Sequence, residues 1–321
     1  MSLARRTIDA FLGLLFPWNF LLVSATCLPK TILRLLRERK FAELLSPSRL
    51  KEAWFSDLWG GIAGPNIRRD AAVRIIPLLQ GRATKGAVVD EQVSPGLAGT
   101  VIEVGAGSGL WVDMYSEIAE VRAGSGLWVD MYSEIAEVRA EPDGAARRRK
   151  VGSSAAVDGP ITRVYGIEPN VNQHPALRRA IAKAGLEDVY RIVPVGIEDL
   201  DDATKWDGVV EKGSVDCIVS ILCLCSIPDP EKNIRELYQY LKKGGRWYIY
   251  EHVRCNNSWY MKAYQRLLNV FWPHFIGGCL LCRQTEKTLR EAGSWEKIDV
   301  AQPVTEPWYQ VVPHRLGVFT K

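Results

Sequence analysis

The chain has 321 residues, 47% of them hydrophobic, and a formal net charge of +4 at pH 7. This length accommodates one large α/β domain with additional segments, and the hydrophobic content excludes a chain that is disordered throughout. The small net charge gives no indication of nucleic-acid binding. The seven cysteines lie in apolar surroundings without a disulfide framework, so we expect reduced thiols and a domain that faces the cytosol.

The N-terminal segment, residues 1–40, contains an uncharged apolar run from Ala10 to Pro29. A helix of that length would span ~30 Å, which is the thickness of a bilayer core. Basic residues are more numerous after the run than before it, which places the rest of the chain in the cytosol. Pro17 and Asn19 interrupt the run, so a kinked span, a re-entrant hairpin, an interfacial helix and a soluble helix packed on the domain all remain open. We predict membrane association rather than a cleaved signal peptide, because no suitable cleavage site follows.

Residues 41–97 connect this segment to the main domain. Their apolar residues are spaced for amphipathic helices, which Gly60-Gly61 and Gly64-Pro65 are expected to interrupt. Residues 80–98 are rich in Gly, Pro and Ser, which predicts a loop. We expect the helices of this segment to cover a ligand site and to help line a pocket.

The main domain, residues 98–321, opens with the sequence VIEVGAGSG from Val101 to Gly109, and an amphipathic helical pattern follows. A strand, a glycine turn and a helix in this order are typical of the start of a nucleotide-binding α/β domain. Glycine lets the backbone turn sharply and lie against a ligand, and the helix N-terminus offers free N–H groups. The dinucleotide pattern G-x-G-x-x-G is not met, because residue 110 is leucine. A glycine-rich turn without a ligand is the alternative.

A sequence of 17 residues occurs twice without a difference, at 106–122 and at 123–139. One duplication does not make a solenoid, which needs several units, and it indicates a recent tandem duplication or an error in the coding sequence. The first copy alone follows a strand, so we predict that it forms the ligand loop and that the second copy interrupts a helix. Residues 141–160 read as a flexible insertion, and we treat the whole stretch 123–160 as additional to the fold.

Two strands are predicted after the insertion. Val164–Asn170 is a short strand that ends at Glu168, and in this fold class the acid at the end of the second strand accepts hydrogen bonds from ribose hydroxyls. Without the insertion, the spacing from the glycine loop to Glu168 is close to the usual ~20 residues. Val189–Val195 is the third strand of the series.

Two apolar runs, Asp216–Ser226 and Arg246–Val253, read as strands that are buried on both faces. The helix between them is expected to begin at Asp229-Pro230. Strands and helices therefore alternate from residue 101 to residue 253, which predicts an α/β fold with a doubly wound parallel sheet.

A resemblance rests on the order of these motifs, which reads EVGAGSG, GIEPN, EDL, GSVDCIVSILCLCSI, LKKGGRWYIYEHV, GGCLLCRQTEKTLREAG and a final PHRLGVFTK. The chain resembles class I S-adenosylmethionine (SAM) methyltransferases and, within them, the membrane-anchored animal thiol methyltransferases of the endoplasmic reticulum and lipid droplets. The resemblance covers most of the chain, and the duplication and the 141–160 insertion depart from it. It implies a seven-stranded, mostly parallel, Rossmann-like sheet, SAM as cofactor and a small acceptor.

The resemblance also implies the residues that contact the cofactor. Glu103 would meet the ammonium group and Glu168 the ribose. Glu198 or Asp199 would reach the adenine amino group, with Ile197 packed on the ring. The full predicted set comprises Glu103, Gly105, Ala106, Gly107, Ser108, Gly109, Glu168, Pro169, Ile197, Glu198, Asp199, Ile221 and Leu222.

The acceptor side is predicted in residues 254–283, which follow the fifth strand and would form an apolar lid. His252, at the end of that strand, is our candidate for the base or orienting residue, and a hydrogen-bonded structural histidine is the alternative. His174 and His314 are less well placed. The aromatic residues of the lid are Trp259, Tyr260, Tyr264, Phe271, Trp272 and Phe275.

A metal site is not expected from the cysteine pattern. Cys279 and Cys282 form one C-x-x-C pair, and the chain has no second pair of this spacing to complete a zinc site. We therefore interpret both as ordinary cysteines.

These features together predict methyl transfer from SAM to an O or S nucleophile of a small apolar molecule, either a phenol or pyrone hydroxyl of a secondary metabolite or an alkyl thiol. The alternative is a catalytically impaired SAM-binding protein associated with a membrane or lipid droplet. The expected partners are a small-molecule acceptor and a membrane, with no nucleic acid. We expect the protein at the endoplasmic reticulum or lipid-droplet membrane, with a cytoplasmic location as the alternative.

Overall fold

A computed structural model describes residues 3–122 and 159–321 of the chain. The second copy of the repeat, residues 123–139, lies outside the described residues, as does nearly all of the predicted 141–160 insertion. The first copy follows a strand and supplies the glycine loop and the helix behind it.

The centre of the domain is a seven-stranded sheet with the order β5-β4-β3-β6-β7-β9-β8. The first five strands of this order pair in parallel, and β9 pairs antiparallel with both β7 and β8. The doubly wound, mostly parallel sheet predicted from the sequence is confirmed. Its strands are β3 (Gly99–Val104), β4 (Ile161–Ile167), β5 (Tyr190–Val193), β6 (Val215–Ile221), β7 (Leu241–His252), β8 (Lys297–Ala301) and β9 (His314–Thr320).

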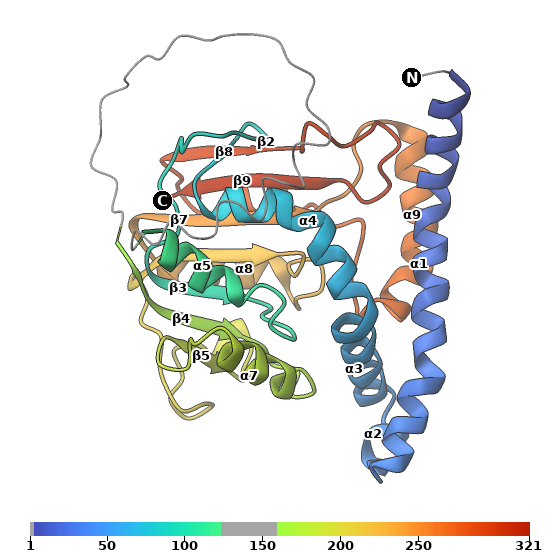
Figure 1. Ribbon diagram of the computed structural model, residues 1–321, viewed down its shortest axis with the longest axis horizontal. Coiled ribbons are helices and arrows are strands. Elements are labelled where there is room, and N and C mark those ends of the chain that lie inside the picture. The colour runs from blue at the N-terminus through green and yellow to red at the C-terminus, as the bar shows by residue number, and fades with distance from the viewer. Residues whose placement is uncertain (1–2, 123–158) are drawn as a thin grey trace.

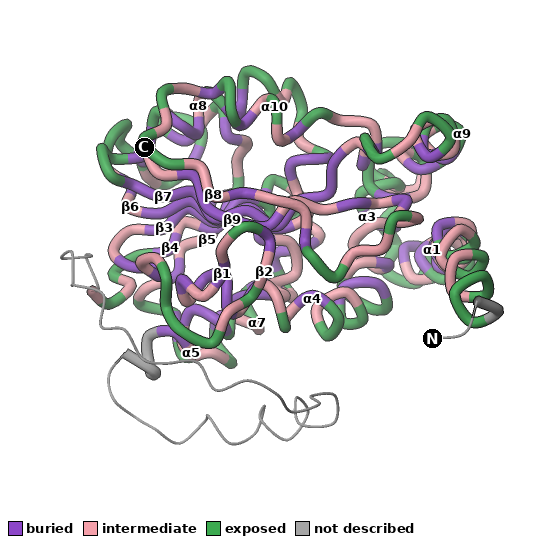
Figure 2. Tube along the Cα trace, turned by 90° about the horizontal axis from the view of Figure 1, so that it is seen from above, coloured by how far each residue is buried: buried purple, intermediate pink, exposed green. Residues whose placement is uncertain are grey.

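The central strands are apolar on both sides because helices cover both faces of the sheet. Along β3, Val101 packs in the core on one face and Ile102 in the core on the other, as the alternation of side chains in a strand requires. Figure 2 shows α4, α5 and α7 on one face and α8 and α10 on the other. These helices are α4 (Gly64–Leu79), α5 (Asp113–Arg122), α7 (His174–Lys183), α8 (Pro230–Tyr240) and α10 (Thr285–Arg290).

The segment before the sheet is almost entirely helical. It comprises α1 (Leu3–Arg37), α2 (Phe41–Leu45), α3 (Pro47–Leu58), a π-helical turn η1 (Trp59–Ala63) and then α4. The interruption predicted at the glycines takes the form of η1, which contains Gly60-Gly61 and separates α3 from α4 without a loop between them. Gly64 has a packing role there, because a Cβ at this position would lie 2.5 Å from Leu110 Cδ1. The predicted loop 80–98 also contains a small hairpin, β1 (Ala83–Thr84) with β2 (Ala87–Val88).

Helix α1 is one continuous helix, and the interruption expected at Pro17 does not occur. It lies beside α9 (Trp259–Phe275), beyond the ends toward which the parallel strands point (Figure 1). The indole of Trp18 donates to the Tyr264 hydroxyl at 2.8 Å, and the indole of Trp54 donates to the Ser24 carbonyl at 2.8 Å. These contacts close a third core between α1, α3 and α9. By length and composition, Arg5–Arg37 could also cross a membrane.

Glu103 is a buried carboxyl within β3. Its Oε2 accepts a hydrogen bond of 2.6 Å from the Tyr190 hydroxyl on β5. Burial raises the pKa of Glu103 to about 7, although the hydrogen bond from Tyr190 acts in the opposite direction. The folded chain therefore keeps a proton on this group at pH values where the unfolded chain has released it.

Replacing Glu103 with glutamine should make the stability of the protein less dependent on pH. In the wild type the folded chain binds more protons than the unfolded chain between pH values of about 4.5 and about 7, so the free energy of unfolding falls as the pH rises through this window. One pKa unit corresponds to about 1.4 kcal/mol, which gives a loss of roughly 3 kcal/mol. Urea unfolding across this pH range should show a smaller loss for Glu103→Gln. The exposed control Glu211→Gln should follow the wild type, and an unchanged slope in Glu103→Gln would contradict this account.

Candidate active site

The loop after β3 has three glycines in the left-handed backbone region, but they serve different purposes. A Cβ at Gly105 would lie 2.6 Å from Cys223 Cβ, and one at Gly109 would lie 2.6 Å from Ala180 Cβ. These two glycines are therefore required for close packing. A Cβ at Gly107 would lie 3.9 Å from its nearest neighbours in the described chain, which belong to Trp59 and to the Gly105 carbonyl. The backbone is open on this side, with space that a ligand could fill.

Glu168 lies immediately after β4, beside the glycine loop. Its Oε2 accepts from the Gly107 amide and its Oε1 from the Asn170 amide, each at 2.8 Å. The carboxyl group is buried, which raises its pKa, while the two backbone amides lower it. A carboxylate has about four acceptor positions, so both oxygens can still accept hydrogen bonds from a ligand.

The other predicted cofactor residues differ in how far they are buried. Ala106 is buried with its amide bonded to the Ile167 carbonyl, whereas Pro169 and Glu198 are exposed and Ser108 and Asp199 are half-buried. These placements are compatible with the predicted roles and do not test them.

Two predicted residues lie in the apolar core rather than on an open surface. Ile197 is 4% exposed and packs in the core on the α8 side of the sheet, and Ile221 is buried at the end of β6. The carboxyl group of Glu103 is also held in the core by Tyr190. Glu103 is 3% exposed, so its contact with the ammonium group of a cofactor stays a prediction.

Leu222 directly follows β6 and has a φ of 54°, which a bulky residue rarely adopts. Its amide donates to the Tyr250 carbonyl at 2.9 Å, which holds this backbone in place. Strained residues of this kind cluster at functional sites. Leu222 also lines a cavity of about 340 Å³, as does Trp59, which lies nearest to the open side of Gly107.

The residues present fit SAM as a cofactor. The space beside Gly107 and the remaining acceptor positions of Glu168 meet at neighbouring ends of parallel strands, where ligands bind in open α/β sheets. Trp59 contacts the space at Gly107 and also lines the cavity. A cofactor held by the loop would therefore lie next to the cavity.

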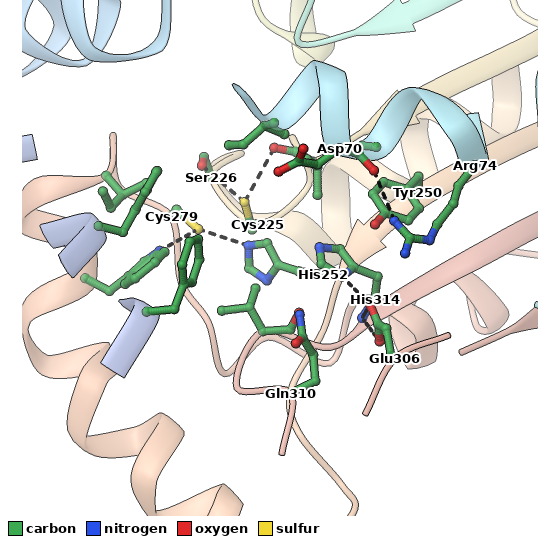
Figure 3. Close-up of a pocket in the computed structure, with 18 of the residues that line it drawn as sticks. Asp70, Arg74, Cys225, Ser226, Tyr250, His252, Cys279, Glu306, Gln310 and His314 are labelled. Atoms are coloured by element: carbon green, nitrogen blue, oxygen red, sulfur yellow. Dashed lines mark hydrogen bonds and ion pairs between the residues drawn. The ribbon is translucent and has the colours of Figure 1, made fainter. Parts of the chain in front are cut away.

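The cavity has an apolar wall and a polar wall (Figure 3). The N-terminal helices contribute much of the apolar wall. Sequence reasoning did not anticipate the part played by α1, because packing between distant segments leaves no local pattern. The apolar wall includes Phe16, Phe20, Phe55, Trp59, Ile67, Trp272 and Ile276, and the polar wall includes Asp70, Arg74, Tyr250, Glu306, Gln310 and His314.

The predicted lid, residues 254–283, covers the cavity with fewer residues than expected. Of its six aromatic side chains, only Trp272 lines the cavity in the part of the chain that the structure describes. Tyr264 and Phe271 contact Trp18 of α1, so they hold the lid helix to the N-terminal helix. Trp259 is 80% exposed on the outer side.

Three side chains from separate segments meet in the cavity wall: Cys225 after β6, His252 at the end of β7 and Cys279 after α9 (Figure 3). His252 Nε2 is 3.0 Å from Cys279 Sγ, and the Trp272 indole donates to the same sulfur at 3.2 Å. A hydrogen bond from the Cys279 thiol, together with the charge of the His252 imidazole, holds the pKa of the Cys225 thiol below its usual value.

The loop that carries Cys225 is held from two sides. Glu251, which is fully buried, accepts from the Cys223 amide at 3.1 Å and from the Leu224 amide at 3.3 Å. Burial raises the pKa of Glu251 to about 8. Arg283 Nη1 donates to the Leu224 and Ile227 carbonyls at 2.8 and 2.7 Å. Backbone on both sides of Cys225 is thus fixed by charged or titratable side chains.

His314 lines the cavity, contrary to the expectation that it is less well placed. The antiparallel pairing of β7 and β9 puts it opposite His252, and its ring stacks on Tyr250 at 4.7 Å. Its Nδ1 is 2.5 Å from Glu306 Oε1. His174 instead bonds through Nε2 to the Glu168 carbonyl at 2.7 Å, next to the cofactor cradle.

Comparison with known proteins agrees with this arrangement. Residues 68–294 match the family described as methyltransferase domain. The chain is 33% identical over 164 residues to the thiol S-methyltransferase TMT1A of Homo sapiens, covering 50% of this chain and 64% of that protein. It is 30% identical over 162 residues to TMT1B of Homo sapiens, again covering 50% and 64%. The matches span less than two thirds of these relatives.

Among solved structures, the geranyl diphosphate C-methyltransferase of Streptomyces coelicolor aligns with 14% identity and a TM-score of 0.42, covering 70% of this chain and 71% of that chain. The family match itself runs from α4 to the segment after α10 and takes in the glycine loop, Glu168 and half of the residues that line the cavity. The chain therefore belongs to the methyltransferase domain family.

Proposed function

We propose that this protein is a SAM-dependent methyltransferase that methylates the sulfur of small apolar thiols. The observation that carries the proposal is the largely apolar cavity next to the open backbone of Gly107, with Trp59 and Leu222 at the junction. Glu168 and the glycine loop would hold the cofactor, which when bound supplies an electrophilic methyl group. The cavity would hold the acceptor and keep water away from the reacting atoms.

A thiol suits this cavity better than a hydroxyl. A thiol has a pKa of about 8.5 and a phenol one of about 10, so a thiol needs less help from a base. His252 is our candidate to orient the acceptor or take its proton, since it lines the cavity beside two cysteines. His314, which also lines the cavity, is already engaged with Glu306. The relatives that carry the name thiol S-methyltransferase support the same choice of acceptor.

We also propose that the protein lies on a membrane surface rather than spanning it through α1. The inner side of α1 packs against the rest of the domain, where Leu21, Ser24 and Leu35 are buried. The outer side exposes large apolar residues along the helix, and Trp259 and Tyr260 of α9 add exposed aromatic rings of the kind that favour membrane interfaces. Phe16 is 59% exposed and also lines the cavity, so an apolar acceptor could enter from the lipid side.

Replacing Gly107 with alanine should weaken cofactor binding without unfolding the protein. The new Cβ would occupy the open space beside the loop, and we expect SAM affinity to fall at least ~10-fold, measured by isothermal titration calorimetry. Alanine in the left-handed region costs roughly 1–2 kcal/mol. Gly185→Ala is a matched control, because Gly185 has a φ of 65° against 56° at Gly107, and the described chain leaves its Cβ position open. Equal SAM affinity in both variants would show that the loop does not hold the cofactor.

The acceptor can be identified by comparing a thiol and a phenol of matched size, such as benzyl mercaptan and para-cresol. We expect formation of S-adenosylhomocysteine at least ~10-fold faster with the thiol, because a larger fraction of it is deprotonated near neutral pH. A phenol that reacts as fast would favour the hydroxyl acceptor. SAM binding without turnover on any acceptor would favour the impaired SAM-binding protein.

Reducing the apolar outer side of α1 should release the protein from membranes. Phe11 and Leu12 are 61% and 58% exposed, and each apolar side chain of this size contributes roughly 1.5–3 kcal/mol when it is buried in lipid. Phe11→Gln with Leu12→Gln should weaken binding to phospholipid vesicles at least ~10-fold in a flotation assay. The control substitutions Val171→Gln and Val209→Gln, at exposed sites outside α1 and α9, should leave flotation unchanged. Unchanged flotation of the α1 variant would contradict the proposed docking face.

A further inference from the structure

The cavity wall contains a group of side chains that methyl transfer does not by itself explain. The ligand atoms of Cys225, His252 and Cys279 all lie within 4.8 Å of one another, and all three residues are buried (Figure 3). They come from three different strands and loops, so this arrangement is a product of the tertiary fold. All three also line the cavity.

The hydrogen bonds around this group leave one of its polar atoms without a partner among the described residues. His252 Nδ1 is buried without a hydrogen-bond partner among the described residues. The Cys225 sulfur is 3.4 Å from the Ser226 hydroxyl and 3.9 Å from the Leu222 carbonyl, in addition to its hydrogen bond with Cys279. The Trp272 indole donates to Cys279 at 3.2 Å, an interaction that stabilises a sulfur carrying negative charge. A zinc ion on Nε2 would leave Nδ1 as it is, so the closeness of Nε2 to the two sulfur atoms is the feature that favours a metal.

Two thiolates and one imidazole are ligands that zinc prefers. With Zn–S bonds of about 2.3 Å and Zn–N bonds of about 2.0 Å, two ligand atoms on one tetrahedral zinc lie roughly 3.5–4 Å apart. The group already lies near this spacing, and a small separation of His252 Nε2 and Cys279 Sγ, now 3.0 Å apart, would admit the ion. The loop that carries Cys225 is fixed by Glu251 and Arg283, which presets one of the ligands.

We propose that Cys225, His252 and Cys279 form a three-ligand zinc site in the cavity wall, and that the sulfur of the thiol acceptor takes the fourth position. Catalytic zinc sites commonly have three protein ligands and one open position, and here the side facing the cavity provides it. The choice of acceptor rests on the proposed thiol methyltransferase function, whereas the metal site stands on its own geometry.

The chemistry of this site balances with the methyl transfer. Binding of zinc displaces the protons of the two cysteine thiols. Binding of the acceptor replaces its S–H bond with a Zn–S bond and releases the proton to water, because a thiol that coordinates zinc is deprotonated. In this arrangement His252 orients the acceptor through the metal and is not the base. The new S–CH₃ bond then forms as the bond between the methyl group and the donor sulfur breaks. The product is a neutral thioether, a weaker zinc ligand than a thiolate, so it can leave.

The metal content of the purified full-length chain tests the site without any assay of activity. After incubation with zinc chloride and gel filtration, we expect about one zinc per wild-type chain by mass spectrometry, and little in Cys225→Ser or Cys279→Ser. Cys282→Ser is the matched control, since Cys282 belongs to the same C-x-x-C pair but lies outside the cluster, and it should retain zinc. Cys279→His supplies another zinc ligand and should restore binding, which separates loss of a ligand from loss of the fold.

A cobalt-loaded sample tests the open position. Co²⁺ in a site with two thiolates should give charge-transfer bands in the near ultraviolet, and benzyl mercaptan added without SAM should shift them. Absence of metal in the folded wild type, or a Cys225–Cys279 disulfide in its place under reducing conditions, would overturn the inference. Turnover that persists in metal-free protein would refute the zinc role and leave the methyltransferase proposal intact. Metal binding with a thiol-dependent shift of these bands but no turnover would support the zinc site and contradict the methyltransferase proposal.

Discussion

The hydrogen bond from the Gly107 amide to the Glu168 carboxylate joins the ends of two neighbouring strands. In the parallel register of β3 and β4, Val104 lies opposite Ile167, so the loops that follow leave the sheet side by side. The buried carboxylate then holds the glycine loop in one conformation. The space beside Gly107, the position of Trp59 and the cavity beyond it all depend on that conformation.

The helices before the sheet supply side chains that form part of the site. The π-helical turn η1 brings Trp59 to the glycine loop, and Phe16 and Phe20 of α1 contribute to the cavity wall. Helix α1 therefore has two sides with different surroundings, one packed against α3 and α9 and one exposed and apolar. This division favours a domain that rests on lipid while its cavity stays within reach of apolar molecules.

Buried polar groups are concentrated around the end of β7. Glu251 and His252 are adjacent in the strand and point to different surroundings: Glu251 binds the backbone amides after β6, and His252 meets Cys279. Burying titratable groups lowers the stability of the fold unless the groups are paired. A fold tolerates this loss of stability where function requires the buried groups. The same local arrangement fixes Cys225 and directs it toward the cavity.

Much of the fold could be predicted from local sequence pattern. Apolar runs and glycine turns identified the strands from β3 to β7. Burial on both faces of the sheet requires apolar residues along a strand, and left-handed backbone favours glycine, so both features are visible in short stretches of sequence. Glu168 was located in the same way, by its place directly after a strand. The direct path from α3 through η1 to α4 was not, because Gly64 packs close to Leu110, a residue far away in the chain.

The sequence by itself determined the strand and helix order, the glycine loop and the apolar character of α1, because each of these features depends on residues that are close together in the chain. Only the tertiary structure decided that Glu103 is held in the core, that His314 lies opposite His252, and that Cys279 joins Cys225 instead of Cys282. Those relationships connect residues far apart in the chain. They arise from strand pairing and from packing between segments, which no local pattern encodes.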